Sequence, residues 1–222
     1  MYRVVYEDDY LVGIDKLSPI PCIRQGGNSG LSDEVVLEYP QLSSIKDYGF
    51  THRLDNDTLG VILIAKTKDY YERTRSLFDE KLVNKTYHAR VRGVVEDETG
   101  TIGLPIAHSS KSVKKMTVVK PGYRIYRSNP REAITEWTVI KKSVDTTDLE
   151  LRTRTGVRHQ IRAHLVSIGF PICGDKLYNN HPDDYPSLML ISKKVLFNCP
   201  VRGDKIELVS TLNLDNMFDV IR

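Results

Sequence analysis

The stretch that most constrains the fold is the apolar run 61–65, together with the polar segment that precedes it. A run of five residues rich in β-branched side chains, bounded by Gly60 and Lys66, is typical of a buried strand. The segment 51–58 is then a loop fixed to a rigid element. Catalytic side chains concentrate in such loops because the strand holds their geometry.

Asp55 is the candidate catalytic residue of this loop. An ionised carboxylate can act as a nucleophile, and Arg53 is near enough in sequence to help keep it charged. The alternative is structural, since Asp and Asn residues close to a Gly are also common turn formers. The segment alone leaves both interpretations open.

A second polar cluster lies in 154–169, where apolar residues recur at helical spacing between two glycines. We therefore expect a helix of about three turns. Its apolar stripe consists of Ile161, Leu165 and Ile168.

Arg158 and Arg162 lie one turn apart on the other face of this expected helix. Like charges at that spacing repel by roughly a few tenths of a kcal/mol unless an anion lies between them. The anion could be a carboxylate such as Asp55 or a phosphate, and two solvated arginines are the alternative.

Basic residues are concentrated between residues 108 and 131, although the net charge of the whole chain is only +3. This segment has no acidic residue, and two tyrosines, Tyr123 and Tyr126, interleave with its basic side chains. Such a stripe suits a phosphate backbone with stackable bases, and a solvated basic hairpin is the alternative. Its seven basic residues are Lys111, Lys114, Lys115, Lys120, Arg124, Arg127 and Arg131.

Hydrophobic patterning outside these clusters predicts an α+β fold. We expect one domain over residues 1–222, with a mixed, largely antiparallel β-sheet, flanking helices and a basic cleft. The strands are expected at 2–6, 11–14, 61–65, 84–93, 133–140 and 148–152, a loop at 18–30, and helices from Ser32 to before Pro40 and over 67–81.

Residues in the expected strand 84–93 alternate in polarity. Tyr87, Ala89 and Val91 then share one face, which we expect to point inward. An inward Tyr usually belongs to the core, but at the rim of a cleft it could stack on a flat ligand.

Several classes of protein are excluded by simple signals. Cys22, Cys173 and Cys199 are odd in number and far apart, so we expect neither a disulfide framework nor a zinc site, and a reducing cytoplasm fits. His159 and His164 do not have the spacing of a metal pair, and we expect no metal. The chain lacks an export signal and a membrane-spanning apolar stretch.

Three segments in this order resemble the RluA-type family of pseudouridine synthases. Residues 52–55, His-Arg-Leu-Asp, with Thr58 and Gly60 are similar to the family's HRLD-x-x-T-S-G motif. Residues 85–89 are similar to its K-x-Y-x-A strand, and residues 155–162 to its T-G-x-x-H-Q-I-R helix. The resemblance extends over most of the chain.

The resemblance implies that the chain isomerises uridine to pseudouridine in structured RNA, either tRNA, ribosomal RNA or both, without a cofactor. Asp55 would be the catalytic carboxylate, Tyr87 would pack against the target uracil, and Arg162 would pair with Asp55. Arg53 would enter the space left by the flipped uridine, because the chemistry cannot occur inside a stacked helix. The expected RNA-binding residues are Arg53, Arg158, Gln160, Lys111, Lys114 and Lys115.

This sequence also departs from the family pattern. Leu59 stands where Ser is usual, and Leu17 stands where Pro is usual. Val157-Arg158 stands where Arg-Thr or a similar pair is common, and Ile191-Ser192 where His-Ala is common. The chain starts directly at the catalytic fold, so we expect a monomer without the accessory N-terminal RNA-binding domain of longer relatives. Two alternatives remain: an inactive RNA-binding relative, and a glycosidase-like hydrolase that uses Asp55 and Asp57 as paired carboxylates.

Overall fold

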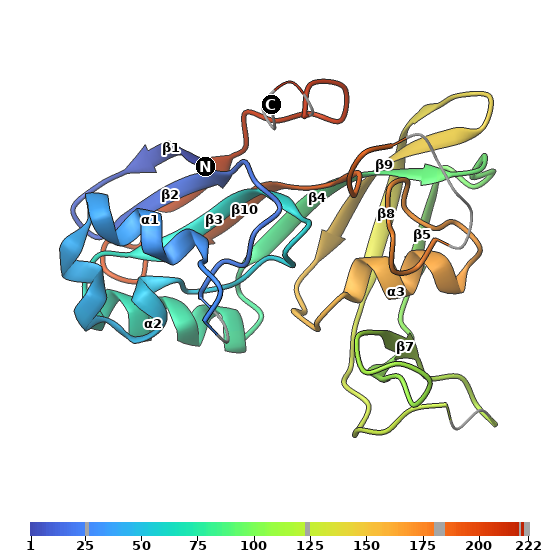
Figure 1. Ribbon diagram of the computed structural model, residues 1–222, viewed down its shortest axis with the longest axis horizontal. Coiled ribbons are helices and arrows are strands. Elements are labelled where there is room, and N and C mark those ends of the chain that lie inside the picture. Colours follow the sequence, from blue (N-terminus) through green and yellow to red (C-terminus); the bar gives the residue numbers. More distant parts are fainter. Residues whose placement is uncertain (25–26, 123–124, 180–184, 218, 220–222) are drawn as a thin grey trace. The chain divides into compact units, whose positions relative to one another are not determined.

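The computed structural model describes residues 1–24, 27–122, 125–179, 185–217 and 219. The chain folds into two compact units, which Figure 1 shows in sequence colours. Unit 1 consists of Met1–Thr86 and Ile191–Arg222, and unit 2 of Tyr87–Leu190. Unit 1 therefore combines the two ends of the chain, while unit 2 is one continuous segment.

The sheet of unit 1 is built around two fully buried strands, β2 (Leu11–Lys16) and β3 (Leu59–Ala65). Strand order is β1-β2-β3-β10, with β11 paired to β10. The pairs β1–β2, β2–β3 and β10–β11 are antiparallel, and β3–β10 is parallel. The two strands predicted at 2–6 and 11–14 are confirmed and pair with each other, and the predicted buried strand 61–65 is confirmed as part of β3. The remaining strands are β1 (Tyr2–Glu7), β10 (Leu190–Asn198) and β11 (Lys205–Val209).

Two α-helices, α1 (Leu31–Glu38) and α2 (Lys68–Asp79), belong to unit 1. Helix α2 begins as predicted, because the Thr67 hydroxyl accepts a hydrogen bond from the Tyr70 amide. Helix α1 begins one residue earlier than predicted, with Gly30 as its N-cap. Two short 3₁₀ helices follow α1: η1 (Pro40–Ser44) and η2 (Lys46–Gly49).

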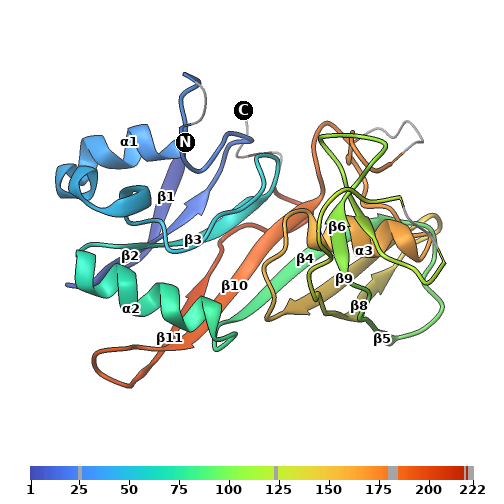
Figure 2. The same cartoon turned by 90° about the horizontal axis from the view of Figure 1, so that it is seen from below.

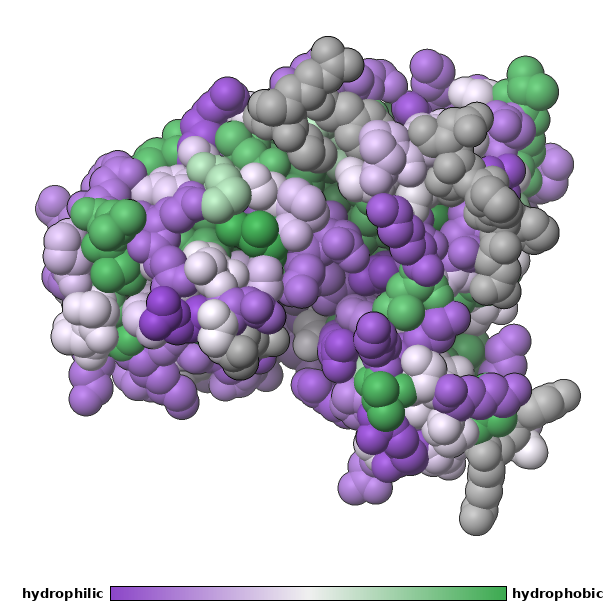
Figure 3. All heavy atoms as spheres, in the orientation of Figure 1, coloured by the Kyte–Doolittle hydropathy of each residue, from purple (hydrophilic) through white to green (hydrophobic). Residues whose placement is uncertain are grey.

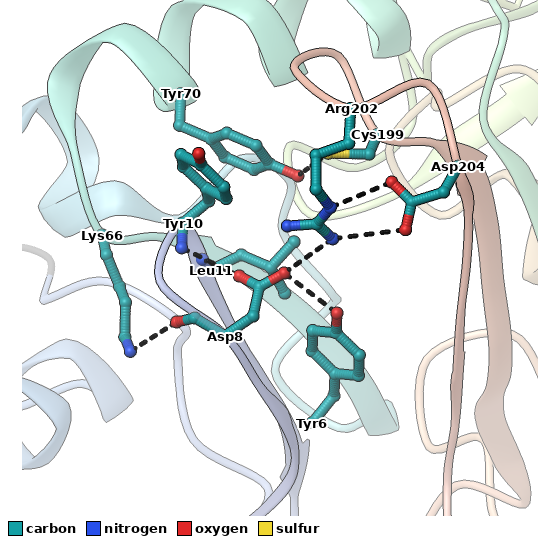
Figure 4. A network of polar contacts seen from close by, with 9 residues as sticks. All are labelled: Tyr6, Asp8, Tyr10, Leu11, Lys66, Tyr70, Cys199, Arg202 and Asp204. Carbon is teal, nitrogen blue, oxygen red and sulfur yellow. Dashed lines mark hydrogen bonds and ion pairs between the residues drawn. The ribbon is translucent and has the colours of Figure 1, made fainter.

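A polar network around Asp8 links the β1–β2 turn to the β10–β11 turn (Figure 4). One carboxylate oxygen of Asp8 accepts from the amides of Tyr10 and Leu11, and the other from the Tyr6 hydroxyl and the Arg202 guanidinium. Burial raises the pKa of Asp8, but these four donors outweigh it and hold the pKa below its ordinary value. The network joins hairpins from opposite ends of the sequence.

Unit 2 contains a sheet with strand order β4-β9-β8-β5 and a separate β6–β7 hairpin. The antiparallel β8–β9 pair confirms the two strands predicted there. The hairpin is formed by part of the basic stripe and lies beside α3 (Figures 1 and 2). The elements are β4 (Asn84–Arg92), β5 (Thr99–Ile102), β6 (Ile106–His108), β7 (Met116–Val118), β8 (Thr135–Lys142), β9 (Thr146–Thr153) and α3 (Gln160–Ser167).

Helix α3 is shorter than predicted. His159, at its N-cap, has left-handed backbone angles, with φ of 52°, so the helix cannot start before Gln160. Arg158 lies in the preceding turn, and Ile168 follows the helix with 37% of its surface exposed. The predicted helical face shared by Arg158 and Arg162 is therefore wrong.

The α+β class with a mixed, mostly antiparallel sheet is confirmed by these pairings. The surface seen in Figure 3 is mainly hydrophilic, with single apolar side chains scattered over it. Within the described ranges, none of the helices has the length and apolarity needed to cross a membrane.

Candidate active site

The loop that carries Asp55 leads directly into β3 in unit 1. The amide of Thr58 donates to the Asp55 carbonyl oxygen at 3.1 Å, which closes a tight turn. Asp55 is half-buried, whereas Arg53 and Asp57 are exposed. The segment therefore forms the turn that one interpretation of its sequence expected, and the catalytic role of Asp55 stays a prediction.

Gly60 fixes the junction between this loop and β3. Its φ is +103°, in the region that favours glycine, and a Cβ there would lie 2.3 Å from the Ser192 carbonyl oxygen of β10. The parallel pairing of Gly60 with Ser192 thus needs a residue without a side chain.

Lys16, at the end of β2, stabilises the Asp55 loop through hydrogen bonds to its backbone. Its side chain is fully buried, and its ammonium group donates to the carbonyl oxygens of Asp55, Asn56 and Thr58. Burial lowers the pKa of Lys16 to about 8, although the nearby Cys22, Asp57 and Asp55 favour its charged form. Sequence reasoning missed this residue, for which the signal was a Lys that follows the apolar residues 11–14 in the same strand.

Cys22 adds a second support for the loop. Its sulfur accepts a hydrogen bond from the Leu54 amide at 3.3 Å and lies 3.4 Å from the Leu54 carbonyl oxygen. The residue immediately before Asp55 is thereby fixed to the segment that follows β2.

His52 acts as a structural residue of the motif. Its Nε2 accepts the amide of Leu63 at 3.1 Å, and its ring lies 4.9 Å from that of Phe78. Burial, helped by the charges of Lys85 and Arg75, lowers the pKa of His52 to about 3. The ring is therefore neutral and anchors the loop to β3 and α2.

Arg162, in unit 2, makes a bidentate ion pair with Asp175. Its Nε and Nη2 donate to the two carboxylate oxygens at 2.8 and 2.7 Å, and both side chains are buried. The Arg162 guanidinium also lies over the Tyr178 ring, 5.2 Å from its centre. Asp175 is a carboxylate partner that sequence reasoning did not identify. The expectation that an anion lies near Arg162 did not name this residue.

Tyr178 connects this pair to the start of α3. Its hydroxyl lies 3.0 Å from His159 Nδ1 and accepts the amide of Met116 at 2.7 Å. The two rings meet edge to face. The Tyr178 side chain thus contacts both Arg162 and His159, the residue at which the helix begins.

Gln160 was expected to contact RNA, but its side chain is buried within unit 2. Its NH₂ group donates to Thr135, Thr153 and the Ile134 carbonyl, and its oxygen accepts from Thr155 and Val157. Gln160 therefore holds the turn before α3 to β8 and β9, and its expected contact with RNA stays a prediction. The exposed Arg158 keeps its side chain at the surface.

Tyr87 lies in β4, where Ala89 and Val91 are buried as the predicted alternation required. Tyr87 itself is half-buried, so its side chain is not part of a sealed core. Farther along the strand, Arg90 makes a bidentate pair with Asp148 of β9 at 2.7 and 2.9 Å. This pair fixes β4 to its neighbour.

The predicted catalytic residues thus divide between the two units, with Asp55 in unit 1 and Tyr87 and Arg162 in unit 2. Asp55 lies in the loop before β3, Tyr87 in β4 and Arg162 in α3, and the pairing of Asp55 with Arg162 stays a prediction. Of the predicted RNA contacts, Arg53, Lys111 and Lys114 are exposed, and Lys115 is half-buried. Tyr123 and Arg124 of the basic stripe lie outside the described residues.

Comparison with known proteins gives the same family as the motifs. The family model described as RNA pseudouridylate synthase matches residues 10–167, well over half of the 222-residue chain. The match includes Asp55, Tyr87 and Arg162.

Curated relatives are similar over most of this chain. An uncharacterized RNA pseudouridine synthase of Aquifex aeolicus is 33% identical, covering 91% of this chain and 66% of that protein. Ribosomal large subunit pseudouridine synthase D of Nitrosomonas europaea is 34% identical, covering 82% and 51%. The chain therefore spans about half to two thirds of the length of these relatives. The dual-specificity RNA pseudouridine synthase RluA of Vibrio cholerae is 32% identical, covering 79% and 67%.

The fold is shared with two solved human structures. Human RNA Pseudouridylate Synthase Domain Containing 1 superposes with a TM-score of 0.79 at 23% identity, covering 96% of this chain and 84% of that one. Domain Containing 4 gives 0.76 at 24% identity, covering 99% and 92%. Motifs, family model and fold agree, and the chain belongs to the RNA pseudouridylate synthase family.

Proposed function

We propose that this chain is an RNA pseudouridine synthase that converts uridine to pseudouridine in tRNA, ribosomal RNA or both, with Asp55 as its catalytic carboxylate. The observation that carries the proposal is the Asp55 loop. Its backbone is held by the buried Lys16, and the half-buried carboxylate stands at the end of a fully buried strand. A carboxylate fixed in this way can meet a flipped base with little loss of conformational entropy.

The reaction breaks the bond between uracil N1 and ribose C1′, turns the uracil, and joins its C5 to C1′. The proton on C5 leaves and N1 gains one, so the atoms balance without a cofactor. Asp55 serves this reaction by attacking C1′ or C6, or by deprotonating the sugar to give a glycal. Each of these three routes needs an ionised carboxylate.

Tyr87 and Arg162, both in unit 2, are proposed to take part in the same reaction as Asp55. The half-buried Tyr87 suits packing against the target uracil and proton transfer. Arg162 pairs with Asp175, and it is proposed to pair with Asp55 as well, since a guanidinium group can bind more than one carboxylate. Arg53 is exposed two residues before Asp55, which supports its proposed role of entering the duplex space left by the flipped uridine.

The names of the relatives support an RNA substrate. The Nitrosomonas protein is named for the large ribosomal subunit, and the Vibrio protein for dual specificity. The three cysteines are free and buried, which suits an enzyme of the reducing cytoplasm.

The test is to incubate the protein with tRNA and ribosomal RNA from a strain lacking its gene, label pseudouridine with carbodiimide, and map the stops of reverse transcription. New stops that disappear with Asp55→Ala and persist with Asp57→Ala are expected. The two carboxylates share one loop, so Asp57→Ala is the matched control.

Other outcomes separate the alternatives. Absence of stops with RNA binding intact would favour the inactive RNA-binding relative. Release of free uracil that needs both Asp55 and Asp57 would favour the hydrolase.

A further inference from the structure

A cavity of about 690 Å³ lies in unit 2 between the β6–β7 hairpin and the outer face of α3. None of Asp55, Tyr87 and Arg162 is among the described residues that line it. Its volume falls in the range of sites for small organic molecules, which is roughly 300–1,000 Å³. The cavity is therefore a candidate binding site that the proposed catalytic residues do not occupy.

The floor of the cavity is apolar and rigid. Met116 and Ala163 are almost fully buried members of a core cluster, and Val118 and Val166 pack against it. Tyr178 closes the wall, held by its hydroxyl contacts with Met116 and His159. A fixed apolar floor of this kind suits a flat ring.

The rim of the cavity is cationic. Lys111, Lys115 and Lys120 line it, and its described lining contains no carboxylate. The ammonium group of Lys115 lies 5.7 Å from the centre of the Tyr178 ring, so one positive charge is held at the wall. Figure 3 shows the hydrophilic side chains that gather over the hairpin, with a few apolar ones among them. The ligand must therefore carry negative charge.

Hydroxyl groups complete the lining. Ser109, Ser112, Thr117 and Ser167 all border the cavity, so donors and acceptors are available for a polar ring edge or a ribose. An apolar floor, a cationic rim and hydroxyl groups between them match the three parts of one nucleotide: base, phosphate and sugar.

We propose that this cavity binds one unstacked nucleotide of the RNA substrate, distinct from the uridine that reacts, with its base on the apolar floor and its phosphate at the lysines. The inference rests on the proposed function, because it takes RNA as the ligand. Binding of a second nucleotide would hold the RNA at unit 2 while Asp55 acts on the first. It would also let this unit contribute to the choice of RNA.

The first test uses uridine 5′-monophosphate and backbone amide NMR of the full chain. Shifts are expected at residues 109–118 and 163–167, and Val166→Phe, which fills the cavity, should remove them. Val144→Phe is the matched control, since Val144 is 97% exposed in the β8–β9 turn of the same unit. Shifts unchanged by Val166→Phe, or absent from the unaltered chain, would overturn the assignment.

A second variant tests the charge without filling the cavity. Lys115→Gln should weaken binding of uridine 5′-monophosphate while leaving that of uridine, which lacks the phosphate, unchanged. Equal weakening of both ligands would contradict the placement of the phosphate.

The RNA itself is the deciding ligand. Val166→Phe should weaken RNA binding by about fivefold or more, and Val144→Phe should not. If Val166→Phe removes binding of the monophosphate but leaves RNA affinity unchanged, the cavity serves a free nucleotide and the inference is wrong. Because these measurements need no turnover, they stay independent of whether pseudouridine forms.

Discussion

The ammonium group of Lys16 lies 3.2 Å from the backbone carbonyl oxygen of Asp55 and 2.9 Å from that of Thr58. The side chain is fully buried, so these carbonyl groups take the place of water around a charge. A buried cation pointing at backbone oxygens fixes the course of the loop more firmly than a surface contact would. The backbone that carries Asp55 is thereby held by a residue of β2.

Replacing Lys16 with Met should therefore loosen the loop and lower kcat far more than it changes RNA affinity. Each carbonyl left buried without a donor costs about 1–3 kcal/mol in the free energy of unfolding. Lys66→Met is the matched control, because Lys66 also donates to a backbone carbonyl, that of Asp8, but outside the loop. Urea unfolding and single-turnover assays on both variants make the comparison. If the two variants have the same kcat, Lys16 does not orient the loop for catalysis.

His52 should make the protein less stable in acid. The pKa of His52 is about 3 in the folded chain against an ordinary 6.5, so between these values the unfolded chain binds a proton that the folded chain does not. Its contribution to stability is full above pH 6.5 and is lost as the pH falls, by at most about 1.4 kcal/mol per pH unit. In urea unfolding from pH 4 to 7, the free energy of unfolding should depend less steeply on pH for His52→Gln than for the unaltered chain. If the free energy of unfolding depends equally on pH in both proteins, His52 does not cause the loss of stability in acid.

Asp175→Asn should lower kcat because it leaves Arg162 buried without its carboxylate. Breaking a buried pair of this kind typically costs about 3–5 kcal/mol in stability. Asp148→Asn is the matched control: it breaks the bidentate pair with Arg90 in the same unit, and that pair is outside the proposed site. Assays well below both unfolding midpoints should show reduced kcat for Asp175→Asn alone. A similar loss in both variants would indicate a purely structural effect.

The lysines between β6 and β7 should contribute to the salt dependence of RNA binding. Joint replacement of Lys111, Lys114 and Lys115 by Ala should reduce the slope of log Kd against log salt by up to about 2–3, since each lost phosphate contact removes roughly 0.7–0.9. The control removes three exposed lysines of unit 1, Lys46, Lys68 and Lys205. Titrations between 50 and 200 mM salt, roughly the range over which counterion release is measured, compare the two sets. An unchanged slope for the hairpin variant would place the RNA elsewhere.

Local signals in the sequence determined much of the fold. The strand β3, the helix α2 with its Thr67 cap and the antiparallel β8–β9 pair follow from apolar periodicity, capping chemistry and short turns. The family motifs likewise predict Asp55, Tyr87 and Arg162 as catalytic residues, because the residues within each motif are close together in the chain.

The start of α3 shows where local signals fail. The apolar stripe through Ile168 predicted a longer helix, but the left-handed backbone of His159 and its contact with Tyr178 set the first residue at Gln160. That contact joins positions 19 residues apart, which periodicity cannot detect.

Only the tertiary structure decided what surrounds the site. Lys16 reaches a loop 39 residues later in the chain, and Arg162 finds its carboxylate at Asp175, after the helix has ended. The physical reason is that a buried charge must be paired with whatever polar group the folded chain brings to it. Sequence patterns indicate that a charged residue needs a partner, and the packing of distant segments determines which residue that partner is.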